Sequence, residues 1–121
     1  MRLKLLIVCS VLAAGASSLM GQSPNGRTGT LVVLNKSVAT ATFIDVASGE
    51  TLATLPTGRG PHELAITRDG RWAVSTDYSG GNSLTVFDVQ NLSVERTIDL
   101  GSYPRPHGAF FLPGDSIMAI T

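Results

Sequence analysis

Cysteine is nearly absent from this sequence, since Cys9 is the only one among its 121 residues. It lies in an apolar run, residues 5–14, which follows Arg2 and Lys4 and precedes several small residues. That order is typical of a secretory signal peptide, and the alanines flanking Gly15 supply an A-x-A cleavage site. We therefore expect residues 1–21 to be a signal peptide cleaved near Ala16, followed by a linker over residues 22–29.

The exported chain would then contain no cysteine. This excludes a disulfide, a thiolate metal site and a cysteine nucleophile, so stability has to come from packing alone. The apolar run is also too short to cross a bilayer comfortably. We expect a periplasmic or extracellular protein without a membrane span once the signal peptide is removed.

An excess of basic charge is missing as well. Nine Lys and Arg residues balance nine Asp and Glu residues, and loss of Arg2 and Lys4 leaves 9 − 2 = 7 basic residues, a net charge near −2. Only 6% of the residues are aromatic. Nucleic-acid binding needs a basic surface, and single-strand binding also needs stacking aromatics. Neither nucleic acid nor a membrane surface is favoured as a partner.

Helical spacing of apolar residues is not sustained over ten positions anywhere beyond the signal region. The sequence instead has thirteen glycines and six prolines, which favour turns between short strands. We predict strands over residues 63–67, 71–77, 83–89 and 93–100. The first two would be joined by a hairpin turn at Arg68-Asp69-Gly70, where glycine accepts a positive φ.

The sequence also repeats. Pro61-His62 matches Pro106-His107 at an offset of 106 − 61 = 45 residues, and residues 42–58 match residues 85–101 at an offset of 43. A period of this length is typical of four-stranded propeller blades. In residues 84–89, alternate side chains are apolar on both faces of the expected strand, which suits a blade sandwiched between neighbours.

These patterns predict an all-β fold made of β-propeller blades, each with four antiparallel strands. Residues 30–35, 41–46 and 51–55 would form three strands of one blade, residues 63–100 a complete second blade, and residues 108–121 half of a third. Propellers close rings of four to eight blades. About two and a half blades therefore suggest an incomplete propeller, the N-terminal fragment of a longer protein.

The segments FIDVASGETLATLPTGRGPHELAITRDGRWAVSTD and VFDVQNLSVERTIDLGSYPRPHGAFFLPGDSIMAIT resemble repeats of the YVTN-repeat β-propeller family, which includes YncE-like exported proteins and lactonase-like seven-bladed propellers. The resemblance covers residues 30–121. It departs from the family where Pro113-Gly114-Asp115 replaces the usual Asp-Gly turn. The strand ends read AVSTD and MAIT rather than YVTN.

His62 and His107 are the first candidate site residues, because each follows the Gly-Pro or Arg-Pro corner of its repeat. The resemblance implies that this corner lies near the mouth of the central channel. Imidazoles there would ligate a metal, a haem or a substrate phosphate, or would simply hydrogen-bond a neighbouring blade. Arg59, Arg105 and Glu63 flank them and would line an anion-binding mouth or a solvated loop.

No catalytic residue, metal site or cofactor is predicted, since two histidines do not make a metal site without a third ligand. Asp45 and Asp88 share one repeat position and are expected to bond to turns or between blades. The favoured function is a binding or interaction scaffold for an unknown protein or small molecule. The alternative is part of a propeller enzyme, such as a lactonase-like hydrolase or a periplasmic oxidoreductase; fold alone does not decide between them.

Overall fold

The computed structural model describes residues 26–121; the expected signal peptide and the first half of the expected linker lie outside the described residues. The described part contains no helix, as the sequence predicted, and therefore none that could cross a membrane. Its nine strands are β1 (Thr30–Asn35), β2 (Thr40–Asp45), β3 (Thr51–Pro56), β4 (Pro61–Ile66), β5 (Trp72–Asp77), β6 (Ser83–Asp88), β7 (Ser93–Asp99), β8 (Ala109–Phe111) and β9 (Met118–Ile120).

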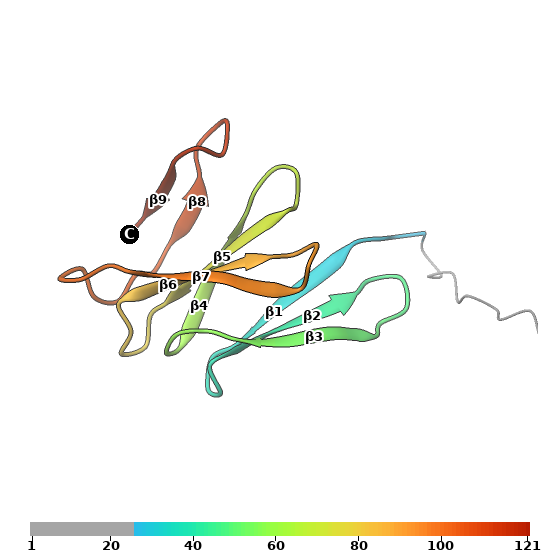
Figure 1. Cartoon of the computed structure of the whole chain (residues 1–121), viewed down its shortest axis with the longest axis horizontal. Coiled ribbons are helices and arrows are strands. Elements are labelled where there is room, and N and C mark those ends of the chain that lie inside the picture. Colours follow the sequence, from blue (N-terminus) through green and yellow to red (C-terminus); the bar gives the residue numbers. More distant parts are fainter. Residues whose placement is uncertain (1–25) are drawn as a thin grey trace, which may run out of the picture.

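The strands form three antiparallel sheets that follow one another along the chain (Figure 1). Their orders are β1-β2-β3, β4-β5-β6-β7 and β8-β9, with every strand paired to its sequence neighbour. The second sheet is one complete four-stranded blade. The first corresponds to its last three strands and the third to its first two. The prediction of an all-β, incomplete propeller is confirmed, and the strand bounds differ from the expected ones by only a few residues.

Aspartates at one repeat position close equivalent turns in the first two sheets. Asp45 Oδ1 accepts hydrogen bonds from the backbone N–H and hydroxyl of Ser48, at 2.6 and 2.8 Å. Asp88 Oδ1 accepts bonds from the backbone N–H groups of Gln90 and Asn91, both at 3.0 Å. The carboxylates therefore stabilise turns through local bonds to the charged form. This confirms the expected turn role of Asp45 and Asp88.

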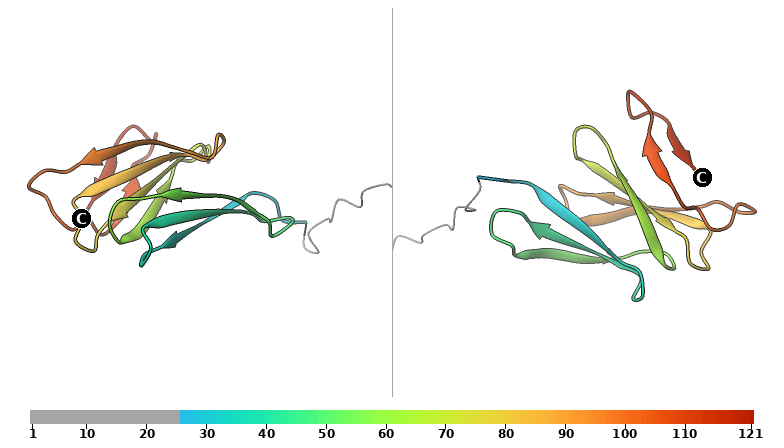
Figure 2. Two further views of the ribbon diagram at one scale, coloured as in Figure 1. Left: turned by 60° about the horizontal axis from the view of Figure 1, so that its bottom comes forward. Right: turned by 180° about the vertical axis from the view of Figure 1, so that it is seen from behind.

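The first and second sheets pack face to face (Figure 2). Phe43 of β2 and Phe87 of β6 are both fully buried between them, with ring centroids 5.4 Å apart in an edge-on arrangement. Aromatic pairs favour this geometry because the positive ring edge meets the negative ring face. Leu84 and Val86, which alternate with Phe87, join a second core cluster on the opposite face. Both faces of the complete blade are thus apolar, as predicted.

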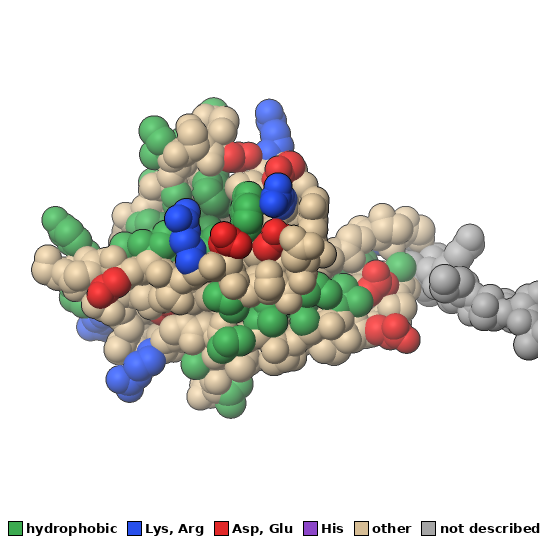
Figure 3. Space-filling view, in the orientation of Figure 1, with side chains coloured by type: hydrophobic (Ala, Val, Ile, Leu, Met, Phe, Trp, Pro, Cys, Tyr) green, Lys and Arg blue, Asp and Glu red, His purple; other side chains and the backbone are tan. Residues whose placement is uncertain are grey.

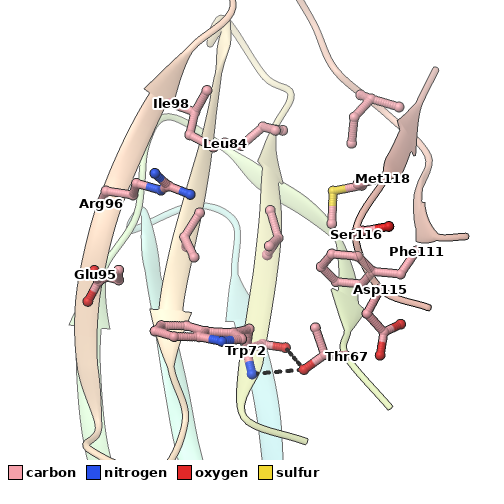
Figure 4. Close-up of a pocket in the computed structure, with 13 residues that line it drawn as sticks. Thr67, Trp72, Leu84, Glu95, Arg96, Ile98, Phe111, Asp115, Ser116 and Met118 are labelled. Carbon is pink, nitrogen blue, oxygen red and sulfur yellow. Dashed lines mark hydrogen bonds between the residues drawn. The ribbon is translucent and has the colours of Figure 1, made fainter. Parts of the chain in front are cut away.

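The opposite face of the second sheet is only partly covered. β8 packs on β4 and β5, and a cleft of about 530 Å³ opens between the β8-β9 hairpin and the sheet. Trp72, Phe111 and Met118 line it from both sides (Figure 4). Figure 3 shows hydrophobic side chains in this region with charged side chains at its edge.

One expectation about the core is wrong. The sequence predicts Phe110, like the other phenylalanines, in the core between blades, yet its side chain is 55% exposed. Phe111 is the residue of β8 that packs against the second core cluster. Because successive strand residues point to opposite faces, Phe110 points away from the second sheet.

Candidate functional site

The two histidines of the repeated corner come together at one end of the sheets. His62 belongs to β4, and His107 precedes β8 by two residues. Their imidazole centroids lie 4.4 Å apart. Because they hold equivalent positions in adjacent repeats, the same corner delivers both rings to one place. His62 is half-buried, whereas His107 is exposed.

Tyr78, the residue after β5, completes a ring cluster with the histidines. Its ring centroid lies 5.1 Å from that of His62 and 5.0 Å from that of His107. The contact with His107 is edge-on, at 88°. The loop carrying Tyr78 is tied to the histidine corner, because the backbone N–H of Tyr78 donates to the carbonyl of Gly60 at 3.1 Å.

Cationic side chains surround the tyrosine. The Arg105 guanidinium lies 5.0 Å from the Tyr78 centroid and donates a hydrogen bond of 3.0 Å to the tyrosine hydroxyl. Lys36 Nζ, from the loop between β1 and β2, lies 5.3 Å from the same centroid. Both are cation–π contacts by distance. The site thus draws side chains from the loops of the first, second and third sheets.

Arg59, also a candidate, lies against a different part of the same loop. A methyl group on Gly80 would lie 3.7 Å from its guanidinium carbon. Arg59 is therefore packed over the tip of the β5-β6 hairpin, while Arg105 contacts the ring cluster through Tyr78.

Glu63 lies beside the histidine pair. Its Oε1 atom is 3.4 Å from Nδ1 of His62, and ligand-type atoms of His62, Glu63 and His107 all lie within 4.8 Å of one another. The Nδ1 atom is buried without a hydrogen-bond partner in the described structure; its contact with Glu63 is close in distance but lacks hydrogen-bond geometry. These three residues could hold a metal ion, with Glu63 as the third ligand that the histidines alone lack.

A buried threonine holds the backbone beneath this group. Thr76 of β5 is fully buried, and its hydroxyl accepts from the N–H of Glu63 at 3.1 Å and donates to the carbonyl of His107 at 2.9 Å. The N–H of His107 in turn donates to the carbonyl of Thr121. The backbones that carry two of the three ligand-type side chains are therefore fixed to one hydroxyl.

Sequence reasoning missed Tyr78, Lys36 and Thr76. In the sequence, Tyr78 begins the segment YSGGNS, which predicts a flexible hairpin tip and no site residue. A usable signal existed, because antiparallel pairing of Asp77 with Pro61 puts the next residue beside the histidine corner. For Lys36 no such signal existed, since its position depends on packing between sheets.

The apolar cleft over β5, β6 and β7 is a second candidate region. Its charged lining residues, Glu95, Arg96 and Asp115, are few beside its apolar ones. At the histidine corner two imidazoles and a tyrosine ring converge with two cationic side chains and a carboxylate. Convergent polar groups of this kind are the usual mark of a ligand site.

Comparison with known proteins supports the fold. No protein-family model and no curated protein matches the sequence. The solved structure of hydrazine synthase from Kuenenia stuttgartiensis is similar over 93% of this chain and 32% of that one, at 22% identity and a TM-score of 0.70. Dihydro-heme d1 dehydrogenase NirN, in complex with DHE, is similar over 83% and 22%, at 22% identity and a TM-score of 0.62.

The β-propeller domain of Cps50 (Swd1) from Myceliophteria thermophila is also similar, over 78% of this chain and 32% of that one, with 19% identity and a TM-score of 0.54. This chain spans a third or less of each of these structures. At such identities the likeness concerns the fold and nothing finer. The chain is an all-β protein with the fold of an incomplete β-propeller.

Proposed function

We propose that this chain is a segment of an exported propeller of the YVTN-repeat type that serves as a binding scaffold for a small molecule with an anionic group. One observation carries the proposal. Rings from adjacent repeats, His62 and His107, meet Tyr78 at 4.4 to 5.1 Å, with Arg105 and Lys36 beside the tyrosine.

The charge of this corner favours an anion. Arg105 and Lys36 bring two positive charges to the tyrosine, against the one carboxylate of Glu63. Arg105 is exposed and uses one guanidinium nitrogen on the tyrosine hydroxyl. Its other N–H groups are available to a ligand, and a guanidinium suits a carboxylate or phosphate because it donates several bonds in one plane.

The test is a titration of the full chain with inorganic phosphate at constant ionic strength, followed through the histidine ring signals by NMR. We expect saturable shifts for His62 and His107. Arg105→Ala should lower the affinity for phosphate at least threefold, whereas Arg68→Ala, at a distant hairpin tip, should leave this affinity unchanged. The ionic strength is kept constant because a change in the screening of exposed charges would shift the histidine signals without any binding. Shifts that do not saturate, or equal effects of the two variants, would overturn the proposal.

A second candidate is part of a propeller enzyme. The cluster of His, Arg and Glu side chains drawn from two repeats is the arrangement that a lactonase-like hydrolase would place at its channel mouth. Hydrazine synthase and NirN are enzymes by name, and NirN is in complex with DHE, which favours the oxidoreductase version. Hydrolysis of a sugar-phosphate lactone, or a haemin absorption change, would support this candidate if His107→Ala abolished it.

A further inference from the structure

The ligand-type atoms of His62, Glu63 and His107 lie within 4.8 Å of one another, so a small side-chain movement would let one ion contact all three. We propose that these side chains bind a first-row divalent transition-metal ion of the Zn²⁺ type. The inference uses the same corner as the proposed anion site, and in part it rests on that function, because it names what the anion would bind.

The donor set suits such an ion. Imidazole nitrogen is a ligand for Zn²⁺ and its neighbours in the series, and two histidines with one carboxylate leave a coordination position open. Bonds of about 2.0–2.2 Å in tetrahedral geometry put ligand atoms about 3.3 Å apart. His62 Nδ1 and Glu63 Oε1 are 3.4 Å apart, so this pair already has the spacing that a shared ion requires.

His107 would complete the site by a small movement. No two of these ligand atoms are more than 4.8 Å apart, so closing to about 3.3 Å needs a movement of about 1.5 Å at most. The His107 side chain is exposed and can move by rotating about its own bonds. The backbone can stay where Thr76 and Thr121 hold it.

The buried nitrogen of His62 is an independent observation that points to a ligand. Its Nδ1 atom has no hydrogen-bond partner among residues 26–121, although buried polar atoms in native proteins nearly always have one. A bound cation would give this nitrogen a partner, provided that the ring presents its lone pair there. Carboxylate proximity alone does not satisfy it, because the contact with Glu63 lacks hydrogen-bond geometry.

The neighbouring cations set the character of the site. Arg105 and Lys36 contact Tyr78 and repel a second positive charge, so the affinity for a bare ion is reduced. The same charges attract an anion to the open coordination position. The metal ion should therefore raise the affinity for the anion, and the anion should raise the affinity for the metal ion by the same factor.

The experiment uses the full chain without a histidine tag and with Cys9→Ser, because a thiol would itself bind the ion. After dialysis against chelator, Zn²⁺ is titrated in competition with a chromophoric indicator, and Co²⁺ is followed by its visible absorption. We expect one equivalent to bind. Glu63→Gln and His107→Ala should each lower the affinity for Zn²⁺ at least tenfold, whereas Glu50→Gln, at an exposed turn in the first sheet, should not change this affinity.

Absence of one-equivalent binding, or unchanged affinity in both ligand variants, would overturn the inference. Circular dichroism checks folding; if His107→Ala is unfolded, Glu63→Gln decides, since this change keeps shape and removes only charge. The two proposals fail separately. Zinc binding without a saturable phosphate shift would support the metal site and overturn the proposed anion site. Phosphate binding without zinc binding would support the anion site and overturn the metal site.

Discussion

The hydroxyl of Thr76 donates a hydrogen bond to the carbonyl of His107, 2.9 Å away, and thereby joins the second sheet to the chain entering the third. The same oxygen accepts the N–H of Glu63. One fully buried side chain thus sets the distance between two proposed ligands. Hydrogen bonds beneath a metal site orient its ligands in this way.

Thr76→Val should separate shape from hydrogen bonding. Valine keeps the size of threonine but leaves the Glu63 N–H and the His107 carbonyl without their partner, at a cost of about 1–3 kcal/mol. Thr76→Ser keeps the hydroxyl and is the matched control. Urea unfolding measures the stability. Zinc affinity should fall about tenfold in Thr76→Val, and equal zinc affinities in the two variants would deny Thr76 a positioning role.

Gly60 tests how the corner holds Tyr78. Its φ is +62°, and an added Cβ would lie 2.3 Å from Cβ of Ser79. Gly101 has a similar φ of +58° but nothing within 4 Å. Gly101→Ala should therefore cost only the backbone strain, about 1 kcal/mol. Gly60→Ala should cost about 1–3 kcal/mol more through the clash.

Gly60→Ala should also displace the tyrosine. The carbonyl of Gly60 accepts the N–H groups of Tyr78 and Ser79, so pushing Ser79 away moves the ring cluster. Thermal melting compares the two alanine variants, and the phosphate titration follows the site. Equal melting temperatures would show that the loop of Ser79 yields without cost.

The sequence predicted the strands well because the signals for them are local. Asp45 and Asp88 close turns through residues two or three positions away, and Gly70 takes the positive φ, +71°, expected of its hairpin. The repeat itself placed His62 and His107 at equivalent corners. What spacing could not supply was the packing angle between sheets, which decides that their rings approach to 4.4 Å.

The roles of single side chains were less predictable. Glu63 and Arg59 were expected together at an anion-binding mouth or in a solvated loop, and the Glu63 carboxylate lies 3.4 Å from Nδ1 of its neighbour His62. Arg59 packs instead over the hairpin tip at Gly80. The position of Arg59 depends on a contact between loops that are distant in sequence. Phe110 was misassigned because adjacent phenylalanines in one strand must face opposite ways.

The Phe43–Phe87 pair should carry much of the stability between the first two sheets. Phe87→Leu keeps most of the volume and should cost about 1 kcal/mol, whereas Phe87→Ala should cost about 3–5 kcal/mol. Phe110→Ala, at an exposed position, should stay within about 0.5 kcal/mol. A double-mutant cycle of leucine variants in urea should give a coupling of about 0.5–1.5 kcal/mol. A coupling of zero would mean that the rings contribute only by burial.

Asp77 and Asp88 are buried on adjacent strands, yet their pKa values shift in opposite directions. Burial raises the pKa of Asp77 above its ordinary 3.8, although bonds from Ser83 and Thr85 oppose this rise. The pKa of Asp88 is lowered, chiefly because the backbone N–H of Asn91 bonds its charged form. The two carboxyl groups should therefore make the stability depend on pH with opposite signs.

For Asp77, the raised pKa means that the folded protein holds this proton more tightly than the unfolded chain. The stabilisation is complete below the ordinary value of 3.8 and is lost as the pH rises through the folded pKa. Asp77→Asn keeps an acceptor for the Ser83 hydroxyl, which lies 2.6 Å from Oδ2, and removes the buried charge. We expect a higher melting temperature than wild type at pH 7, with the gap narrowing as the pH falls toward 4.

Asp88→Asn should behave in the opposite way. Its lowered pKa adds stability above 3.8 that is lost as the pH falls through the folded value, so the variant should melt below wild type at pH 7 and approach it in acid. Melting curves of wild type and both variants between pH 3 and pH 8 test the two opposite pH dependences. If Asp77→Asn also melted below wild type at pH 7, the bonds from Ser83 and Thr85 would outweigh the burial of the charge. The blade would then need an ionised carboxylate at the end of β5, where the ring cluster begins.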